Sequence, residues 1–121
     1  MSTPQAIAER YNALWLQTDA AQRRRDIEAF FAPDVRHYVN EREAIGYDAL
    51  EARITASHEK NVRDGRNTFR VHSAQQLRGI VIFDWEMIPA NAPKTVLAIG
   101  REVVGFNDRG QAVTDHMFIL A

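Results

Sequence analysis

Apolar residues recur at helical spacing near the start of the chain and indicate two helices. The first is expected over residues 4–17, because its apolar positions fall on one stripe of a helix surface. These positions are Ile7, Tyr11, Leu14 and Trp15. Asp19, followed three residues later by Gln22, is typical of a helix start. It predicts a second, short helix that ends before Pro33.

The next segment predicts a short strand over residues 35–40 and a third helix. Gly46 interrupts the chain between them, so the helix is expected to begin there. Gly65 is placed as its C-cap. One face of this helix carries Leu50, Ile54, His58 and Val62.

The second half of the chain is rich in Val, Ile, Phe and Thr and predicts four strands. They are expected over residues 67–77, 80–88, 95–106 and 111–120. Because the segments between them are short, neighbouring strands should pair antiparallel as a meander. In residues 80–88 both the odd-numbered and the even-numbered positions carry apolar side chains. A strand with one face in water shows a clearer alternation of apolar and polar residues. We therefore expect helices on one face of the sheet and a second copy of the chain, in a homodimer, on the other.

The composition is that of one globular domain over residues 1–121, with 45% hydrophobic and 26% charged residues. The formal net charge of -1 gives no electrostatic footprint for nucleic acid or for an anionic membrane. The chain has no cysteine, which excludes disulfides, thiolate catalysis and Cys-based zinc sites. No apolar stretch is long enough to span a membrane, and residues 1–8 lack a signal-peptide core. A cytoplasmic location is expected.

Short sequence stretches accompany this order of elements. They are Met1-Ser2-Thr3-Pro4 before Arg10-Tyr11, Phe31-Ala32-Pro33-Asp34-Val35 leading into the first strand, Gly46, Lys94-Thr95-Val96 opening a later strand, and Phe106-Asn107 before a turn at Gly110. Taken in order along the whole chain, they resemble the nuclear-transport-factor-2-like superfamily, and within it the SnoaL-like and ketosteroid-isomerase-like branch. The resemblance implies an α+β cone, in which a curved antiparallel sheet packs against three N-terminal helices. It also implies a pocket between sheet and helices, commonly in a homodimer.

The resemblance to ketosteroid isomerases implies roles for three positions. Tyr11 matches the family's tyrosine and Glu102 its protonated acid, which together donate to the substrate oxygen. The position of the proton-transferring aspartate is occupied by Asn40, and an amide cannot take up a proton at neutral pH. We therefore do not expect ketosteroid isomerase activity.

The group that replaces this aspartate is left open by the sequence. The candidates are Glu41, Glu43, His58, Asp115 and the nearby His37. Strand alternation places His37 on the face opposite Tyr38 and Asn40.

Each of the three candidate catalytic residues, Tyr11, Glu102 and Asp115, has a structural alternative. Tyr11 lies either on the pocket wall or in the core, with its hydroxyl bonded to a carbonyl. Glu102 lies on an apolar parity, so it is protonated, paired with Arg70 or Arg101, or directed into a wet cavity. Asp115 is either a site acid, as the resemblance to SnoaL-like cyclases implies, or an exposed strand residue.

Five residues are predicted to line the pocket: Trp15, Tyr38, Asn40, His58 and Trp85. His58 also fits the alternative of a core histidine with its hydrogen bonds satisfied. The four histidines show no metal-ligand spacing, and the chain has no Gly-rich phosphate loop. We expect no metal and no cofactor.

Two functions are left open by these residues. The first is a cofactor-free enzyme that acts on a small apolar carbonyl compound by acid/base chemistry, as an isomerase, cyclase or dehydratase. The alternative is a non-catalytic module that binds a small apolar ligand in the same pocket. A protein-interaction domain is a third reading, supported only by the expected dimer face.

Overall fold

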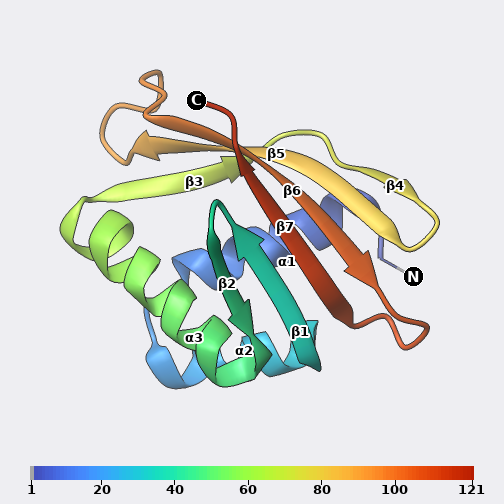
Figure 1. The fold of residues 1–121 in the computed structure, drawn as a ribbon. Coiled ribbons are helices and arrows are strands. Elements are labelled where there is room, and N and C mark those ends of the chain that lie inside the picture. Colours follow the sequence, from blue (N-terminus) through green and yellow to red (C-terminus); the bar gives the residue numbers. More distant parts are fainter. Residues whose placement is uncertain (1) are drawn as a thin grey trace.

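The computed structural model describes residues 2–121 and shows three α-helices and seven strands among them (Figure 1). The helices are α1 (Pro4–Leu16), α2 (Ala20–Phe30) and α3 (Gly46–Ser57), and a π-helical segment, η1 (His58–Asp64), continues α3. The strands are β1 (Phe31–Val39), β2 (Arg42–Ile45), β3 (Asn67–Val71), β4 (Gln75–Leu77), β5 (Ile80–Pro89), β6 (Ala98–Phe106) and β7 (Ala112–Ile119). The predicted α+β class is confirmed.

Local chemistry explains where the helices begin. The Thr3 hydroxyl accepts a hydrogen bond from the Ala6 amide at 3.1 Å at the start of α1. Asp19 does the same for the Gln22 amide at 2.8 Å at the start of α2, as predicted. Gly65 is the C-cap of η1, as predicted. Its φ of -77° is right-handed, so it does not adopt the left-handed conformation that usually favours glycine at a C-cap.

The strands form one sheet in the order β2-β1-β7-β6-β5-β3, with β4 also paired to β5. The antiparallel pairs β3–β5, β5–β6 and β6–β7 confirm the predicted meander. The single strand expected over residues 67–77 is wrong, because the chain leaves the sheet at residues 72–74 between β3 and β4. Strand β2 and the parallel pairing of β1 with β7 were not predicted from the sequence.

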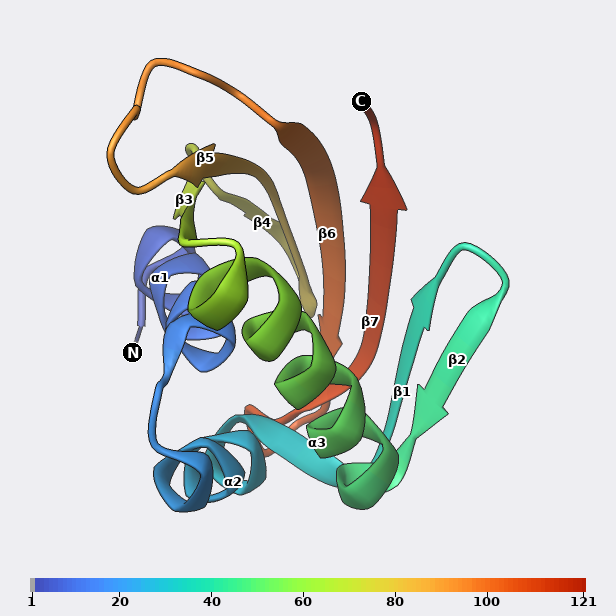
Figure 2. The same ribbon diagram turned by 90° about the vertical axis from the view of Figure 1, so that its left-hand side faces the viewer.

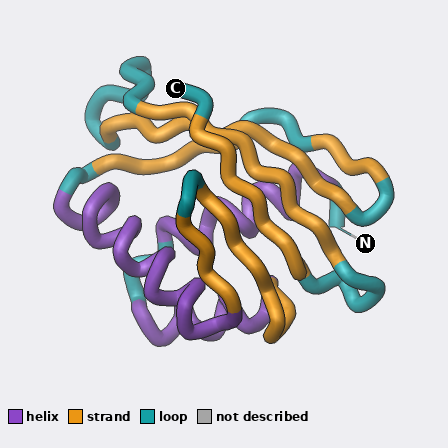
Figure 3. The backbone as a smooth tube through the Cα atoms, in the orientation of Figure 1, coloured by secondary structure: helices purple, strands orange, loops and turns teal. Residues whose placement is uncertain are grey.

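The helices lie on one face of the sheet, which curves around them (Figures 1 and 2). The smooth tube of Figure 3 shows the same two layers, helices below and strands above. Buried side chains of α1, α3 and the inner face of the strands fill the space between them, and they include Leu14, Leu50, Ile54, Val81 and Val104. No helix within residues 2–121 is long and apolar enough to cross a membrane. This arrangement leaves room for a cavity on the inner face of β5, β6 and β7.

Candidate functional site

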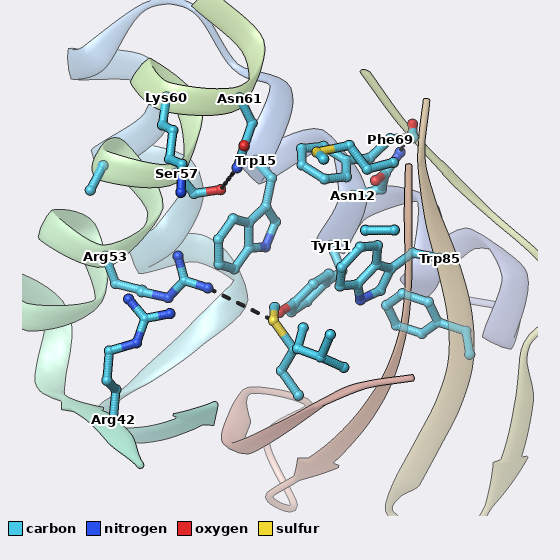
Figure 4. A pocket seen from close by; sticks show the side chains of 16 residues that line it. Tyr11, Asn12, Trp15, Arg42, Arg53, Ser57, Lys60, Asn61, Phe69 and Trp85 are labelled. Carbon is cyan, nitrogen blue, oxygen red and sulfur yellow. Dashed lines mark hydrogen bonds between the residues drawn. The ribbon is translucent and has the colours of Figure 1, made fainter. Parts of the chain in front are cut away.

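A cavity of about 270 Å³ lies between the helices and the inner face of the sheet (Figure 4). Its apolar wall comes mainly from the strands and includes Phe69, Phe83, Trp85, Met87, Ala98 and Met117. Its polar wall comes mainly from α1, β2, α3 and η1 and includes Asn12, Arg42, Arg53, Ser57, Lys60 and Asn61. Tyr11 and Trp15, one helical turn apart on α1, complete the wall. The cavity is therefore apolar on one side and polar on the other.

Behind this wall the Tyr11 hydroxyl lies between two buried carboxyl groups. Its oxygen is 2.6 Å from Oδ2 of Asp115 and 3.0 Å from Oε2 of Glu102. Both acids are fully buried, on neighbouring strands β7 and β6. A phenol has one proton to donate, and the shorter distance assigns it to Asp115. The hydrogen bond between Tyr11 and Glu102 then requires Glu102 to donate its own carboxyl proton to the Tyr11 oxygen, so Glu102 is protonated.

Two further side chains extend this arrangement. The Trp85 indole donates its N–H to Oε1 of Glu102 at 2.9 Å. Nδ1 of His37 lies 2.8 Å from Oδ2 of Asp115, and His37 and Asp115 are register partners on the parallel strands β1 and β7. We call the connected side chains Trp85, Glu102, Tyr11, Asp115 and His37 the buried network.

The two acids of the buried network differ in charge. Burial raises the pKa of Glu102 well above its usual range, and the nearby charge of Asp115 adds to this effect. Burial alone would also raise the pKa of Asp115, but hydrogen bonds with Glu102, His37 and Tyr11 reverse the sign and lower it. The pKa of Tyr11 is raised well above 10 by burial and by the two acids. At neutral pH Glu102 is therefore neutral, Asp115 is a carboxylate and Tyr11 keeps its proton.

Solved structures with the same architecture include a proposed isomerase of the SnoaL-like family from Agrobacterium tumefaciens. It has a TM-score of 0.87 and 21% sequence identity, over 100% of both chains. The chain has the NTF2-like fold. An NTF2-like protein of unknown function from Exiguobacterium sp. 255-15 has a TM-score of 0.71 and 16% identity, over 94% of this chain and 98% of its own. A proposed polyketide cyclase from Sinorhizobium meliloti has a TM-score of 0.67 and 12% identity, over 92% of each chain.

No protein-family model and no curated protein matches the chain. The predicted resemblance to NTF2-like proteins is thus confirmed through the fold that they share. The roles of individual residues have to be argued from the geometry of this chain.

The NTF2-like fold brings together the three residues proposed as catalytic from the sequence. Tyr11, Glu102 and Asp115 are in direct hydrogen-bond contact or linked through the Tyr11 hydroxyl. The exposed-strand alternative for Asp115 does not hold, because Asp115 is fully buried. Pairing of Glu102 with an arginine does not hold either, because Arg70 pairs with Glu86 and Arg101 with Asp84. Glu102 nevertheless does not reach the cavity, because Tyr11 and Trp85 occupy the wall in front of it.

Of the five residues predicted to line the pocket, only Trp15 and Trp85 do so. Tyr38 lies on the outer face of the sheet, where its ring is 5.1 Å from that of His116. Asn40 is exposed in the turn between β1 and β2, with a φ of 52°. His58 is buried with Nδ1 3.1 Å from the Trp15 carbonyl oxygen, which is the satisfied-core alternative. The three predicted pocket positions are therefore wrong. Tyr38 and Asn40 are directed away from the cavity by β1 and the turn after it, and His58 packs into the core.

His37 is the functional candidate that the sequence argument set aside. It is buried, because it shares the inner parity of β1 with Val35 and Val39 rather than the outer parity of Tyr38. That apolar parity was the signal that identifies its face. Its ring lines a second cavity of about 270 Å³, and Arg42 and Arg53 line both cavities.

The second nitrogen of His37 makes no hydrogen bond within the described residues. Nε2 is buried and has no hydrogen-bond partner among residues 2–121, while Nδ1 is held by Asp115. Within the same residues, no three His, Asp or Glu side chains are arranged to hold a metal ion. The geometry therefore offers an imidazole with one nitrogen anchored to a carboxylate and the other free.

Proposed function

We propose that this chain is an enzyme that moves a proton on a small carbonyl compound, in a reaction of the isomerase, cyclase or dehydratase type. The observation that carries the proposal is that His37 lines the second cavity, with Nδ1 bonded to the Asp115 carboxylate and a buried Nε2 that has no hydrogen-bond partner among residues 2–121. A histidine with this arrangement is suited to general acid/base catalysis, because the carboxylate fixes which nitrogen carries the proton.

The proton transfer can be written for a β,γ-unsaturated carbonyl compound. Nε2 of His37 takes the proton from the carbon next to the carbonyl group, the electron pair of that C–H bond forms a new C=C bond, and the carbonyl π pair moves to the oxygen to give a dienolate. The imidazolium then returns the proton to the γ-carbon as the carbonyl re-forms, which moves the double bond into conjugation and completes an isomerisation. Asp115 balances the charge of the imidazolium and keeps the ring oriented.

Tyr11 and Glu102 support this chemistry from behind the wall. The sequence argument expected both to donate to a substrate oxygen, but Glu102 has no access to the cavity in this structure. Their hydrogen bonds instead keep Asp115 in the charged form that an imidazolium needs. They are positioning residues in this scheme, and His37 is the catalytic residue.

The structural neighbours support the reaction class. One is described as a proposed isomerase and another as a proposed polyketide cyclase, and both share the NTF2-like fold. Since one fold hosts many activities, the buried network of this chain carries the argument.

Hydrogen–deuterium exchange tests the proposal without knowledge of the natural product. The protein is incubated in deuterium oxide with a panel of small enolisable ketones and keto acids, and proton NMR follows the loss of the C–H signal next to the carbonyl. We expect at least one compound to exchange faster with the protein, and His37→Gln to reduce this rate by about 100-fold or more. His72→Gln is the matched control, because His72 is exposed and its ring bonds to Glu86 on the outer face. A panel in which no compound exchanges faster with the wild type than with His37→Gln contradicts the proposal.

The alternative function is a non-catalytic module that binds a small ligand. The burial of Glu102 and Asp115 behind the wall favours it, because their hydrogen bonds are made within the protein. Ligands that bind in the cavity without any exchange of their C–H protons would support this alternative.

A further inference from the structure

Three cationic side chains line the first cavity without a counter-ion. They are Arg42 on β2, Arg53 on α3 and Lys60 on η1. None of the ion pairs formed among residues 2–121 involves any of the three. The neighbouring Arg24 and Arg63, by contrast, are each paired with acids. The positive charge at this cavity is therefore uncompensated by direct contacts.

Arg53 is the most enclosed of the three. Its guanidinium carbon lies 5.0 Å from the centre of the Trp15 ring, and Nη2 donates to the Met117 sulfur at 3.8 Å. Nε is buried without a hydrogen-bond partner among residues 2–121. A guanidinium offers five N–H donors in a planar fork, so most of the hydrogen-bonding capacity of Arg53 is unused.

Arg42 lies next to Arg53. Figure 4 shows both guanidinium groups at the same end of the cavity, on the side away from Trp85. Burial lowers the pKa of Arg53, and the nearby charge of Arg42 lowers it further. The charge of Asp115 acts on Arg53 from a distance, but Asp115 is already bonded to His37 and Tyr11.

The wall contributed by the strands is largely apolar. Phe69, Phe83, Trp85, Met87 and Ile119 belong to it and offer no charged group. A ligand that contacts both this wall and the two arginines has an apolar or aromatic body and an anionic head. An apolar ligand was expected from the sequence. The cationic lining was not foreseen, because Arg42, Arg53 and Lys60 come to one cavity only in the folded chain.

We infer that the cavity takes a small amphipathic anion, with its carboxylate or phosphate group bound by Arg42 and Arg53 and its apolar body against Trp85. The inference rests on the proposed function in so far as it names the substrate class of the same site. It places the anionic group at the border of the two cavities, next to His37, where the proton transfer is proposed.

Binding of matched probes tests the inference. The probes are 3-phenylpropanoate, its neutral counterpart 3-phenylpropanamide, and phenyl phosphate. Trp15 and Trp85 are the two tryptophans of the chain and both line the cavity, so their fluorescence reports binding directly. We expect at least one anion to bind about 10- to 100-fold more tightly than the amide, since a hydrogen bond to a charged group gains this much. The tighter of the two anions identifies the kind of head group.

Variants separate direct contact from long-range attraction. Arg53→Met keeps the apolar stem against Trp15 and should abolish the preference for the anion. Arg63→Met is the matched control, because Arg63 is on η1 outside the cavity and its removal changes the net charge equally. Arg63→Met should still bind the anion more tightly than the amide. If Arg53→Met does not fold, the exposed Arg42→Met should still reduce the preference about tenfold.

Equal affinity for the acids and the amide overturns the inference, as does failure of all three probes to bind. An equal loss in Arg53→Met and Arg63→Met also overturns it, because the effect is then net charge alone. These failures are distinguishable from failure of the proposed function. Anion-selective binding without hydrogen–deuterium exchange supports the anion-binding inference and contradicts the proposed enzyme function. Exchange of neutral ketones without anion selectivity supports the enzyme function and contradicts the anion-binding inference.

Discussion

The Trp85 indole packs directly against Gly100, its register partner on β6, so closely that no Cβ atom at residue 100 would fit. This close approach brings the indole N–H to Glu102 at 2.9 Å, two residues further along the same strand. The same ring forms part of the cavity wall. One glycine thus determines both the shape of the wall and a hydrogen bond of the buried network.

We predict that Gly100→Ala destabilises the protein by about 1–3 kcal/mol, because the added methyl group displaces the Trp85 ring. Guanidinium chloride unfolding followed by circular dichroism measures the loss. Trp85→Leu removes the clashing ring, so Gly100→Ala should cost less in that background, as a double-mutant cycle reveals. An equal cost in both backgrounds would show that Trp85 is not the cause.

Removal of the Tyr11 hydroxyl should cost more than removal of the Tyr47 hydroxyl. Tyr11 bridges two buried acids, and Tyr11→Phe leaves the Asp115 carboxylate without one of its donors, for an expected loss of about 1–3 kcal/mol. The Tyr47 hydroxyl donates to the Phe31 carbonyl at 2.8 Å from a half-buried side chain, where water can replace it. Chemical unfolding of both variants at pH 7 makes the comparison. Equal losses would contradict the charged state assigned to Asp115.

The inner residues of the meander were predictable because local alternation sets them. Glu102 shares the parity of Gly100 and Val104, and all three are buried. The meander also places β7 beside β6, so Glu102 and Asp115 approach each other through pairing between strands that are adjacent in sequence. Tyr11 joins them from α1, as the resemblance implied.

The role of His37 was not predictable in the same way. Alternation groups His37 with Val35 and Val39 on the inward face, but it does not say which residue of another strand lies opposite His37. That neighbour is fixed by the parallel pairing of β1 with β7, which places His37 opposite Asp115. This pairing joins segments 78 residues apart, and no local pattern specifies it. The grouping of Arg42 with Arg53 likewise depends on the position of β2, which the sequence argument did not anticipate.

We predict a homodimer formed through the outer face of the sheet. Ile80 and Phe118 are both exposed on this face, at 43% and 52% of their surface, and a second copy of the chain packed on the face would cover them. Phe118→Asp should therefore give a monomer by light scattering, where the wild type gives a dimer. Ile45→Asp on β2 is the control, because Ile45 is equally exposed at the edge of the sheet. A monomer mass for the wild type throughout the micromolar range would refute the dimer.

The last prediction concerns the opposite pH dependence of the two buried acids. The pKa of Glu102 is raised in the folded state, so the unfolded chain releases this proton near 4.5 while the folded protein keeps it. The contribution of Glu102 to stability is therefore complete below pH 4.5 and is lost as the pH rises toward its folded pKa. Glu102→Gln removes this loss, and its stability relative to wild type should rise by up to about 1.4 kcal/mol per pH unit above 4.5.

Asp115→Asn should show the reverse. The pKa of Asp115 is lowered below 3.8 in the folded state, so its contribution is complete above that value and is lost as the pH falls through the folded pKa. The penalty of Asp115→Asn should be constant near neutral pH and shrink in acid. Urea unfolding of both variants and the wild type from pH 3 to pH 8 measures the two slopes. If Glu102→Gln instead loses stability relative to wild type as the pH rises above 4.5, Glu102 is ionised in the folded protein. The buried network would then hold two negative charges, and Asp115 would lose the neutral neighbour on which the role of His37 depends.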